Sequence, residues 1–288
     1  MAISFQGLGN EGRLGNQMFQ YAFVRGVAAN RGFDWIVPGP DADRLDNYGL
    51  FDAFELYGCF PQNQGEPFFH KQEVYRDMAF NEKIYNECED NTNFSGNFQT
   101  ELYFESISAD IREDFTFKKD YLEPCQEFIS SLGSSPIFIH IRQSDNIGRE
   151  EFHPILPLSY FESALEFWSP DTPCFVFTDD LDWCKKQSFF DNDRFIFNDN
   201  PERYEYQTID GTGKMQNTLL PQVDLCLMSL CSGGIIANSS FSWWGAWLQN
   251  GRGNIIAPDP EKWYGSAMTH LDTSMMVPAR WQIHYWSK

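Results

Sequence analysis

The sequence is poor in positive charge. Lysine and arginine together number 21 against 41 aspartates and glutamates, which gives a net charge of −20 at pH 7. A surface this acidic repels nucleic-acid phosphates and anionic lipid head groups, so we expect no nucleic-acid partner. An anionic ligand must then be held locally, by a few cations and by backbone N–H groups.

Three other features are missing. The seven cysteines form no CxxC pair and several lie in apolar runs, so we expect reduced core residues and neither a disulfide frame nor a zinc site. No apolar run approaches the roughly 18 residues of a membrane span. The first residues, MAISFQG, lack the charged-then-apolar pattern of a signal peptide.

Hydrophobic residues make up 42% of the 288, enough for a packed core. The second half alternates strand-like and helix-like segments, which favours a parallel α/β sheet. There we expect strands at 137–141, 174–178, 194–197, 234–237 and 254–257, and helices at 160–167, 181–187, 221–231 and 241–249. Before it we expect strands at 2–5 and 34–38, a helix at 17–30 ended by Gly32, and a helix near 103–112, with weak periodicity elsewhere in 39–130.

Ligands of parallel α/β sheets bind just beyond the carboxyl ends of the strands. This rule directs attention to the residues that follow three of the expected strands. They are Arg142 and Asp145 after 137–141, Asp179 and Asp180 after 174–178, and Asn238 to Ser240 after 234–237.

The first strand is followed by a glycine-rich run, GLGNEG at 7–12, which formally matches GxGxxG. With Asp34 about 20 residues further on, the spacing is that of a dinucleotide-binding fingerprint. However, the helix begins only after a second turn, and Asp34 precedes its strand instead of following it. We therefore favour a tight loop that brings backbone N–H groups to a ligand anion over nicotinamide or flavin binding, with a purely structural turn as the alternative.

The run His140-Ile141-Arg142-Gln143-Ser144-Asp145 places His140 and Arg142 on one face at the end of a strand. An arginine there suits a diphosphate, because its planar fork supplies charge and two directed hydrogen bonds. The alternative is a structural Arg142–Asp145 ion pair beside a core histidine.

The acidic run FTDDLDW (177–183) contains a D-x-D, Asp180 to Asp182, which can hold a divalent metal against a diphosphate. An aspartate after a strand is equally typical of a helix N-cap, and we expect no metal.

The serine run that opens the helix near 241 carries the most specific signal. Hydroxyls and free N–H groups at a helix N-terminus form an uncharged phosphate clamp. We expect the serines to serve a ligand and most of the neighbouring tryptophans to pack in the core.

Together these runs resemble one family, the α-1,2-fucosyltransferases of glycosyltransferase family 11, over residues 3 to about 265. The matching segments are RLGNQMFQYA (13–22), SGNFQTELYF (95–104), HIRQSD (140–145), FVFTDDLDW (175–183) and DLCLMSLCSGGIIANSSFSWWGAWL (224–248).

The resemblance implies an α/β, GT-B-like fold with two Rossmann-like domains facing across a cleft. We expect an acceptor-side domain at 1–132 and a GDP-sugar-binding domain at 133–288. The implied reaction is inverting, metal-independent transfer of L-fucose from GDP-fucose to the 2-hydroxyl of a terminal β-galactose, without a cofactor. The implied partners are GDP-fucose and a galactose-terminated oligosaccharide, in a bacterial cytoplasmic protein that is either free or peripheral at the inner membrane.

The resemblance also implies roles for residues. Arg142 would hold the diphosphate, Asp145 would act as base or orient Arg142, and His140 completes the expected catalytic set. The expected donor-binding residues are Gly15, Asn16, Gln17, Asp179, Asp224, Asn238, Ser239, Ser240 and Ser242, with Asp224 on the guanine.

The chain departs from the usual HxRRGD pattern of the family at Gln143 and Ser144. One cation is therefore missing from a site that stabilises a leaving diphosphate, which predicts weaker activity or an altered donor. It also leaves open a non-catalytic nucleotide-sugar or glycan-binding protein. A metal-dependent transferase that uses Asp180 and Asp182 is a further alternative.

Overall fold

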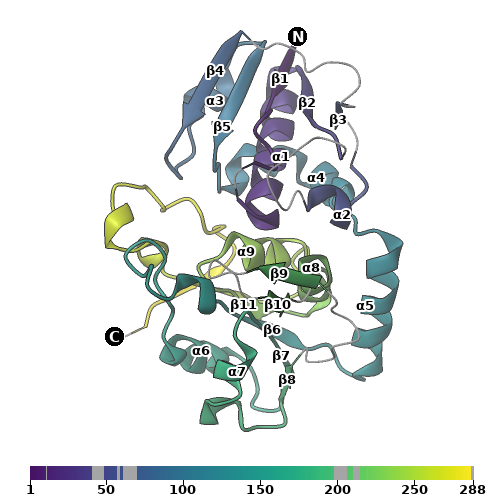
Figure 1. Cartoon of the computed structure of the whole chain (residues 1–288), viewed down its shortest axis with the longest axis vertical. Coiled ribbons are helices and arrows are strands. Elements are labelled where there is room, and N and C mark those ends of the chain that lie inside the picture. The colour runs from purple at the N-terminus through teal and green to yellow at the C-terminus, as the bar shows by residue number, and fades with distance from the viewer. Residues whose placement is uncertain are drawn as a thin grey trace. The chain divides into compact units, whose positions relative to one another are not determined.

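The computed structural model describes residues 1–10, 12–40, 49–56, 59–60, 70–197, 206–209, 215–218 and 220–286. The chain divides into two compact units (Figure 1). The first comprises Met1–Lys118 with His270–Pro278, and the second Lys119–Thr269 with Ala279–Lys288.

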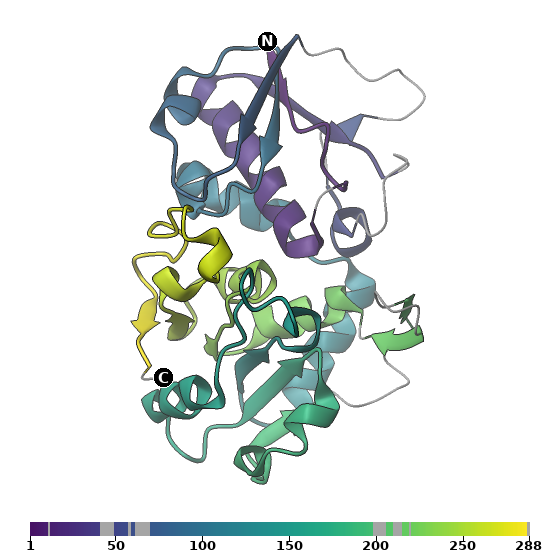
Figure 2. The same cartoon turned by 60° about the vertical axis from the view of Figure 1, so that its left-hand side comes forward.

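The first unit is built on a five-stranded parallel sheet of order β3-β2-β1-β5-β4. Its strands are β1 (Ala2–Ser4), β2 (Asp34–Pro38), β3 (Cys59–Phe60), β4 (Lys71–Tyr75) and β5 (Thr92–Gly96). Its helices are α1 (Leu14–Arg31), α2 (Leu50–Ala53), α3 (Glu82–Glu87) and α4 (Ser108–Asp114). Figure 2 shows α1, the purple helix, running along the strands of this unit.

Helix α1 begins at Leu14, three residues before the predicted start, so Gly15 and Asn16 lie in its first turn. The Arg13 carbonyl accepts the N–H groups of Asn16 at 2.9 Å and Gln17 at 3.1 Å, which closes that turn without a side-chain cap. Gly32 ends the helix as predicted, at φ 67° in the left-handed region that suits glycine.

An aromatic cluster forms the core of the first unit. Phe23 of α1 stacks on Phe98 at 3.6 Å between ring centroids, and Phe94 and Tyr103 meet its edge at 5.1 and 4.9 Å. All four side chains are fully buried. These rings therefore serve packing, and they are not available to stack on a sugar.

The second unit contains a six-stranded parallel sheet of order β13-β12-β11-β6-β7-β8, which confirms the predicted parallel α/β organisation. The strands are β6 (Ile137–Ile141), β7 (Cys174–Thr178), β8 (Phe195–Phe197), β11 (Gly234–Ile235), β12 (Ile255–Pro258) and β13 (Gln282–His284). A separate antiparallel pair consists of β9 (Tyr206–Ile209) and β10 (Met215–Thr218).

The helices of this unit cover its sheet, and one of them carries the tryptophans that were expected to pack in the core. They are α5 (Lys119–Ser131), α6 (Leu158–Ala164), α7 (Leu181–Cys184), α8 (Pro221–Leu230) and α9 (Ser240–Trp247). Trp243, Trp244 and Trp247 of α9 are at most 2% exposed, and Trp244 contacts the other two rings edge to face, so they pack in the core as expected.

The second unit begins at Lys119, ahead of the expected boundary at 132/133. The cause is α5, which packs against α8: Cys125 Sγ lies 3.9 Å from the carbonyl oxygen of Val223. The segment His270–Pro278, which belongs to the first unit, was not anticipated.

Six cysteines with described side chains are free thiols: Cys88 is partly exposed, and Cys125, Cys174, Cys184, Cys226 and Cys231 are buried, in keeping with thiols of the core. Within the described ranges, no helix is both long and apolar enough to cross a lipid bilayer.

Candidate functional site

Three segments of the second unit place polar side chains at one edge of its sheet. Arg142 follows β6, Asp179 follows β7, and Asn238 and Ser239 follow β11 and lead into α9. Because β6 pairs in parallel with both β7 and β11, the carboxyl ends of these strands meet at the same edge. As predicted from the ends of the strands, residues from three distant parts of the sequence lie at this one edge.

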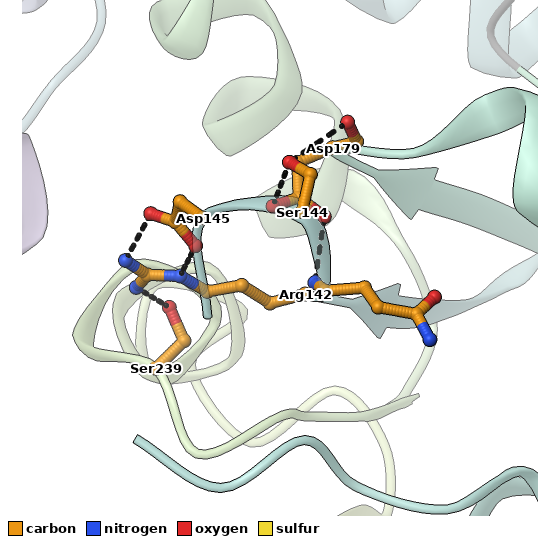
Figure 3. Close-up of polar contacts among 6 residues, drawn as sticks. Arg142, Ser144, Asp145, Asp179 and Ser239 are labelled. Atoms are coloured by element: carbon orange, nitrogen blue, oxygen red, sulfur yellow. Dashed lines mark hydrogen bonds and ion pairs between the residues drawn. The ribbon is translucent and has the colours of Figure 1, made fainter. Parts of the chain in front are cut away.

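Arg142 is held by a bidentate pair with Asp145 (Figure 3). Its Nε donates to Asp145 Oδ1 at 3.0 Å and its Nη2 to Oδ2 at 2.7 Å, while Nη1 donates to Ser239 Oγ at 3.3 Å. The two charged side chains are 30% and 26% exposed, so the pair is reachable from solvent. Burial lowers the pKa of Arg142, but the hydrogen bonds and charge of Asp145 outweigh it and raise the pKa overall, so the guanidinium stays charged.

Asp179 holds the turn that follows Arg142. Its Oδ1 accepts the backbone N–H of Gln143 at 2.8 Å, and its Oδ2 accepts the Ser144 hydroxyl at 2.8 Å. The surrounding protein and the nearby Asp145 raise the pKa of Asp179, although these two hydrogen bonds and Arg142 oppose the shift. Both carboxylate oxygens are thus occupied by the chain itself, which favours a structural role for this predicted donor ligand.

His140 is buried, 8% exposed, at the end of β6 with its ring 5.9 Å from that of Phe241. Burial, together with the charge of Arg142, lowers the pKa of His140 to about 3. Its Nδ1 has no hydrogen-bond partner among the described residues. The imidazole is therefore neutral near pH 7 and cannot supply charge to a ligand.

The serine run divides its tasks. Ser239 is the N-cap residue of α9, and its Oγ accepts a hydrogen bond from Arg142 Nη1. Ser242 is fully buried, and its Oγ accepts the backbone N–H of Ala237 at 3.3 Å. Ser240 is partly exposed in the first turn. Ser239 and Ser240 thus stand where the free N–H groups of a helix N-terminus attract anions, while Ser242 closes the turn beneath them.

Asn238, also predicted to bind the donor, is used internally. Its Nδ2 donates to the carbonyl oxygens of Pro154 at 2.9 Å and Trp263 at 3.0 Å. Asp224 lies in the first turn of α8 and is 8% exposed, so it belongs to the same unit as Arg142. Its contact with guanine stays a prediction.

The remaining predicted donor residues lie in the first unit. Gln17 is fully buried: its Nε2 donates to Gly12 O at 3.1 Å and its Oε1 accepts the N–H of Gly49 at 3.1 Å. Asn16 Oδ1 accepts from Gln99 Nε2 at 3.0 Å. The amide of Gln17 therefore holds the glycine-rich loop, and contact of Gly15, Asn16 and Gln17 with a donor stays a prediction.

The acidic run supplies a helix cap. Asp180 is the N-cap residue of α7 and its Oδ1 accepts the N–H of Trp183 at 2.9 Å, while Asp182 is exposed. In the described ranges, no three His, Cys, Asp or Glu side chains gather as they would around a metal ion. The capping alternative for Asp180 is thus the one that the geometry supports.

Sequence reasoning missed two aromatic neighbours of Arg142. The rings of His153 and Tyr264 lie 5.9 Å apart. Burial and the charge of Arg142 lower the pKa of His153, whereas burial raises the pKa of Tyr264 and the charge of Arg142 only opposes that shift. Tyr264 follows β12, so the strand-end rule applied to that strand would have indicated it. His153 lies in the same loop as Asp145, eight residues later, where no short motif marks it.

Comparisons with known proteins agree with the predicted family. The family model described as Glycosyl transferase family 11 matches residues 70–275, more than half of the 288 residues. An Alpha-1,2-colitosyltransferase from Escherichia coli is 28% identical over 94% of this chain and 95% of its own length. A Galactoside 2-alpha-L-fucosyltransferase SEC1 from Bos taurus is 22% identical over 84% of this chain and 63% of its own length.

A solved structure of POFUT1 in complex with GDP-fucose matches with a TM-score of 0.53 at 11% identity, covering 88% of this chain and 94% of that one. This likeness concerns the fold and confirms the predicted α/β, GT-B-like class. The arrangement of two domains across a cleft stays a prediction. The match of the family model over most of the sequence decides the assignment: the chain belongs to glycosyl transferase family 11.

Proposed function

We propose that this protein transfers L-fucose from GDP-fucose to the 2-hydroxyl of a terminal β-galactose of a glycan, with inversion at the anomeric carbon and without a metal ion. The observation that carries the proposal is the Arg142 fork, fixed by Asp145 and directed at Ser239 beside the N-terminus of α9. A charged fork next to a helix N-terminus suits a diphosphate.

The names of similar proteins support the donor and the linkage. The two curated relatives are named for α-1,2 transfer of colitose and for 2-α transfer of L-fucose to a galactoside, and the structurally similar POFUT1 was crystallised with GDP-fucose. The acceptor and the donor sugar of this chain are proposals that rest on these names and on the site.

Charge stabilisation would be the main catalytic contribution of the chain. As the bond between fucose and diphosphate breaks, negative charge grows on the leaving GDP while the sugar becomes oxocarbenium-like. Arg142, the Ser239 hydroxyl and the N–H groups at the start of α9 are already oriented, so they can stabilise this charge without reorganisation. Loss of one such donor typically costs about 10²–10³ in kcat.

Asp145 fits an orienting role better than that of the base. Both of its carboxylate oxygens accept hydrogen bonds from Arg142, so taking a proton from an acceptor hydroxyl would remove the negative charge on which this pair depends. His140 is buried and its pKa is lowered to about 3, so a role as proton donor at neutral pH is disfavoured.

Gln143 leaves the site with one cation fewer than the HxRRGD pattern supplies. The backbone N–H of Gln143 bonds Asp179, and its buried Oε1 has no partner among the described residues. The residue therefore contributes to the turn and not to the charge of the site, which predicts a weaker hold on the diphosphate than an arginine would give.

A second candidate is transfer of colitose from its GDP derivative, favoured by the relative that matches nearly the full length of this chain. Colitose is fucose without the hydroxyl at C3, so the same diphosphate site can serve both donors. The two candidates differ only in what surrounds the sugar.

The test is transfer to a panel of β-galactosyl acceptors in EDTA, with GDP-fucose and GDP-colitose offered separately. The proposal expects an α-1,2-linked fucosyl product, with kcat/KM for GDP-fucose the higher of the two. A higher kcat/KM for GDP-colitose would select the second candidate. Tight GDP binding without any product from either donor would favour the binding-only alternative.

A further inference from the structure

Three short segments of the second unit meet at Asn238: the loop 149–154 after β6, the run 237–239 before α9 and the segment 263–267 after β12. Asn238 Nδ2 donates to Pro154 O at 2.9 Å and to Trp263 O at 3.0 Å, which ties the first segment to the third. The side-chain amide has two N–H donors, and both are used here. The side chain of Asn238 therefore has no N–H left for a donor phosphate.

Backbone hydrogen bonds extend this tie. Gly265 N donates to Phe152 O at 3.0 Å, and Ala267 N donates to Glu151 O at 2.8 Å. A Cβ on Gly265 would lie 2.3 Å from the carbonyl oxygen of Glu150 and 2.4 Å from that of Glu151, so only glycine permits this approach. The loop and the segment are thus closely paired, and Asn238 bonds both of them beside Ser239.

These hydrogen bonds hold the rings of His153 and Tyr264 beside the candidate diphosphate site. His153 adjoins Pro154 and Tyr264 adjoins Trp263, and their ring centroids lie 5.9 Å apart. The surrounding protein, Arg142 and Arg149 lower the pKa of His153, and Asp145 opposes them. The phenol of Tyr264 is a further titratable group beside this imidazole.

We propose that Asn238 is a positioning residue: it fixes the loop 149–154 to the segment 263–267 and thereby holds the His153–Tyr264 ring pair beside Arg142 and Asp145. The proposal rests on the proposed function only where it concerns turnover. It assigns Asn238 a task distinct from that of its neighbour Ser239, which contacts Arg142 directly.

The first test is an NMR titration of His153, whose signal is identified by its loss in His153→Gln. In the wild type we expect His153 to titrate below the ordinary value of about 6.5. Asn238→Ala frees the loop, so the His153 titration should move back toward that value. Gly265→Ala disturbs the same pairing from the other side and should move it in the same direction, which keeps the test open if one variant fails to fold.

The second test measures GDP affinity by calorimetry and kcat/KM for fucose transfer. In Asn238→Ala we expect the GDP affinity and kcat/KM each to fall by about tenfold, because displacement of the loop 149–154 would misplace the diphosphate.

Gln249→Ala is the matched control. Gln249 is 1% exposed, and its Nε2 also donates to two carbonyl oxygens, those of Met228 at 2.8 Å and Gly233 at 3.3 Å. This variant should lower thermal stability while the His153 titration, GDP affinity and kcat/KM stay within twofold of the wild type.

Unchanged His153 titration in a folded Asn238→Ala variant would overturn the proposal, as would a changed titration with unchanged GDP affinity. Failure of the proposed function is distinguishable. If the wild type binds GDP but transfers no fucose, the titration and the GDP affinity still decide the role of Asn238.

Discussion

The guanidinium of Arg142 and the carboxylate of Asp145 form a two-pronged pair, with Nε–Oδ1 at 3.0 Å and Nη2–Oδ2 at 2.7 Å. The pair fixes the plane of the fork and leaves Nη1 directed at Ser239. A flexible arginine becomes an oriented donor in this way, and orientation in advance is what makes such a group effective toward a charge that develops during reaction. Turnover and GDP binding should therefore both depend on this pair.

Arg142→Lys should lower kcat/KM by about 10²-fold or more, because an ammonium cannot bond both Asp145 oxygens and a phosphate in one plane. Steady-state kinetics with GDP-fucose measure the effect, and circular dichroism checks the fold. A lysine variant that keeps most of the wild-type kcat/KM would show that charge alone suffices and that the fork has no special role.

Asp145→Asn should weaken GDP binding as well as turnover, because the amide offers one acceptor in place of two and releases the fork. We expect Kd for GDP to rise about tenfold, as typical for loss of a charge-assisted pair. Calorimetry with GDP alone separates the two roles of Asp145. An unchanged Kd together with loss of turnover would support the base and contradict orientation.

Ser144→Ala should raise the pKa of Asp179 further, because the Ser144 hydroxyl is one of the groups that lower it. A carboxyl-detected NMR titration follows Asp179, and Asp179→Asn identifies its signal. A pKa of Asp179 that falls in Ser144→Ala would mean that the hydroxyl does not donate to the carboxylate.

Stability should depend on pH through His140. Its pKa is about 3 in the folded chain, below the ordinary value, so the unfolded chain binds the proton more readily. The stabilisation is therefore complete above pH about 6.5 and is lost progressively as pH falls toward 3. Between pH 7.5 and 5 the wild type should lose about 2 kcal/mol more than His140→Gln. Urea unfolding followed by tryptophan fluorescence measures this, and equal losses would show that His140 is not buried as a neutral group.

Much of the second unit could be predicted from the sequence because its signals are local. The strands β6 and β7 are short apolar runs, and both were expected at the bounds observed. Their parallel pairing followed from the alternation of strands and helices, and the strand-end rule then indicated Arg142, Asp179 and Ser239. In that region, hydrophobic pattern and chain order suffice.

The first unit was predicted only in part. β2 was expected at its observed bounds and α1 with its end at Gly32, but the short elements that follow them were not expected. β3 has two residues and α3 has six, and neither carries a periodic pattern of useful length. In the second unit, helix α5 was not expected either, and its packing on α8 involves a contact between residues about 100 positions apart, Cys125 and Val223.

The hydrogen bonds of the Asn238 and Gln17 side chains to backbone groups also could not be predicted from the sequence. Motif similarity marked both as donor ligands, but the hydrogen bonds of their amides go to backbone groups that no local pattern reveals. Asn238 bonds residues 84 positions before it and 25 after it. A polar residue in a motif can thus support the site by fixing the backbone segments around it.

The most direct test of the central claim is fucose transfer from GDP-fucose to β-galactosyl acceptors with EDTA present, the linkage being read by NMR. The account predicts an α-1,2-linked product in EDTA, lost in Arg142→Lys. A folded, GDP-binding protein that yields no such product, or that yields it only when a divalent metal is restored, would contradict the account.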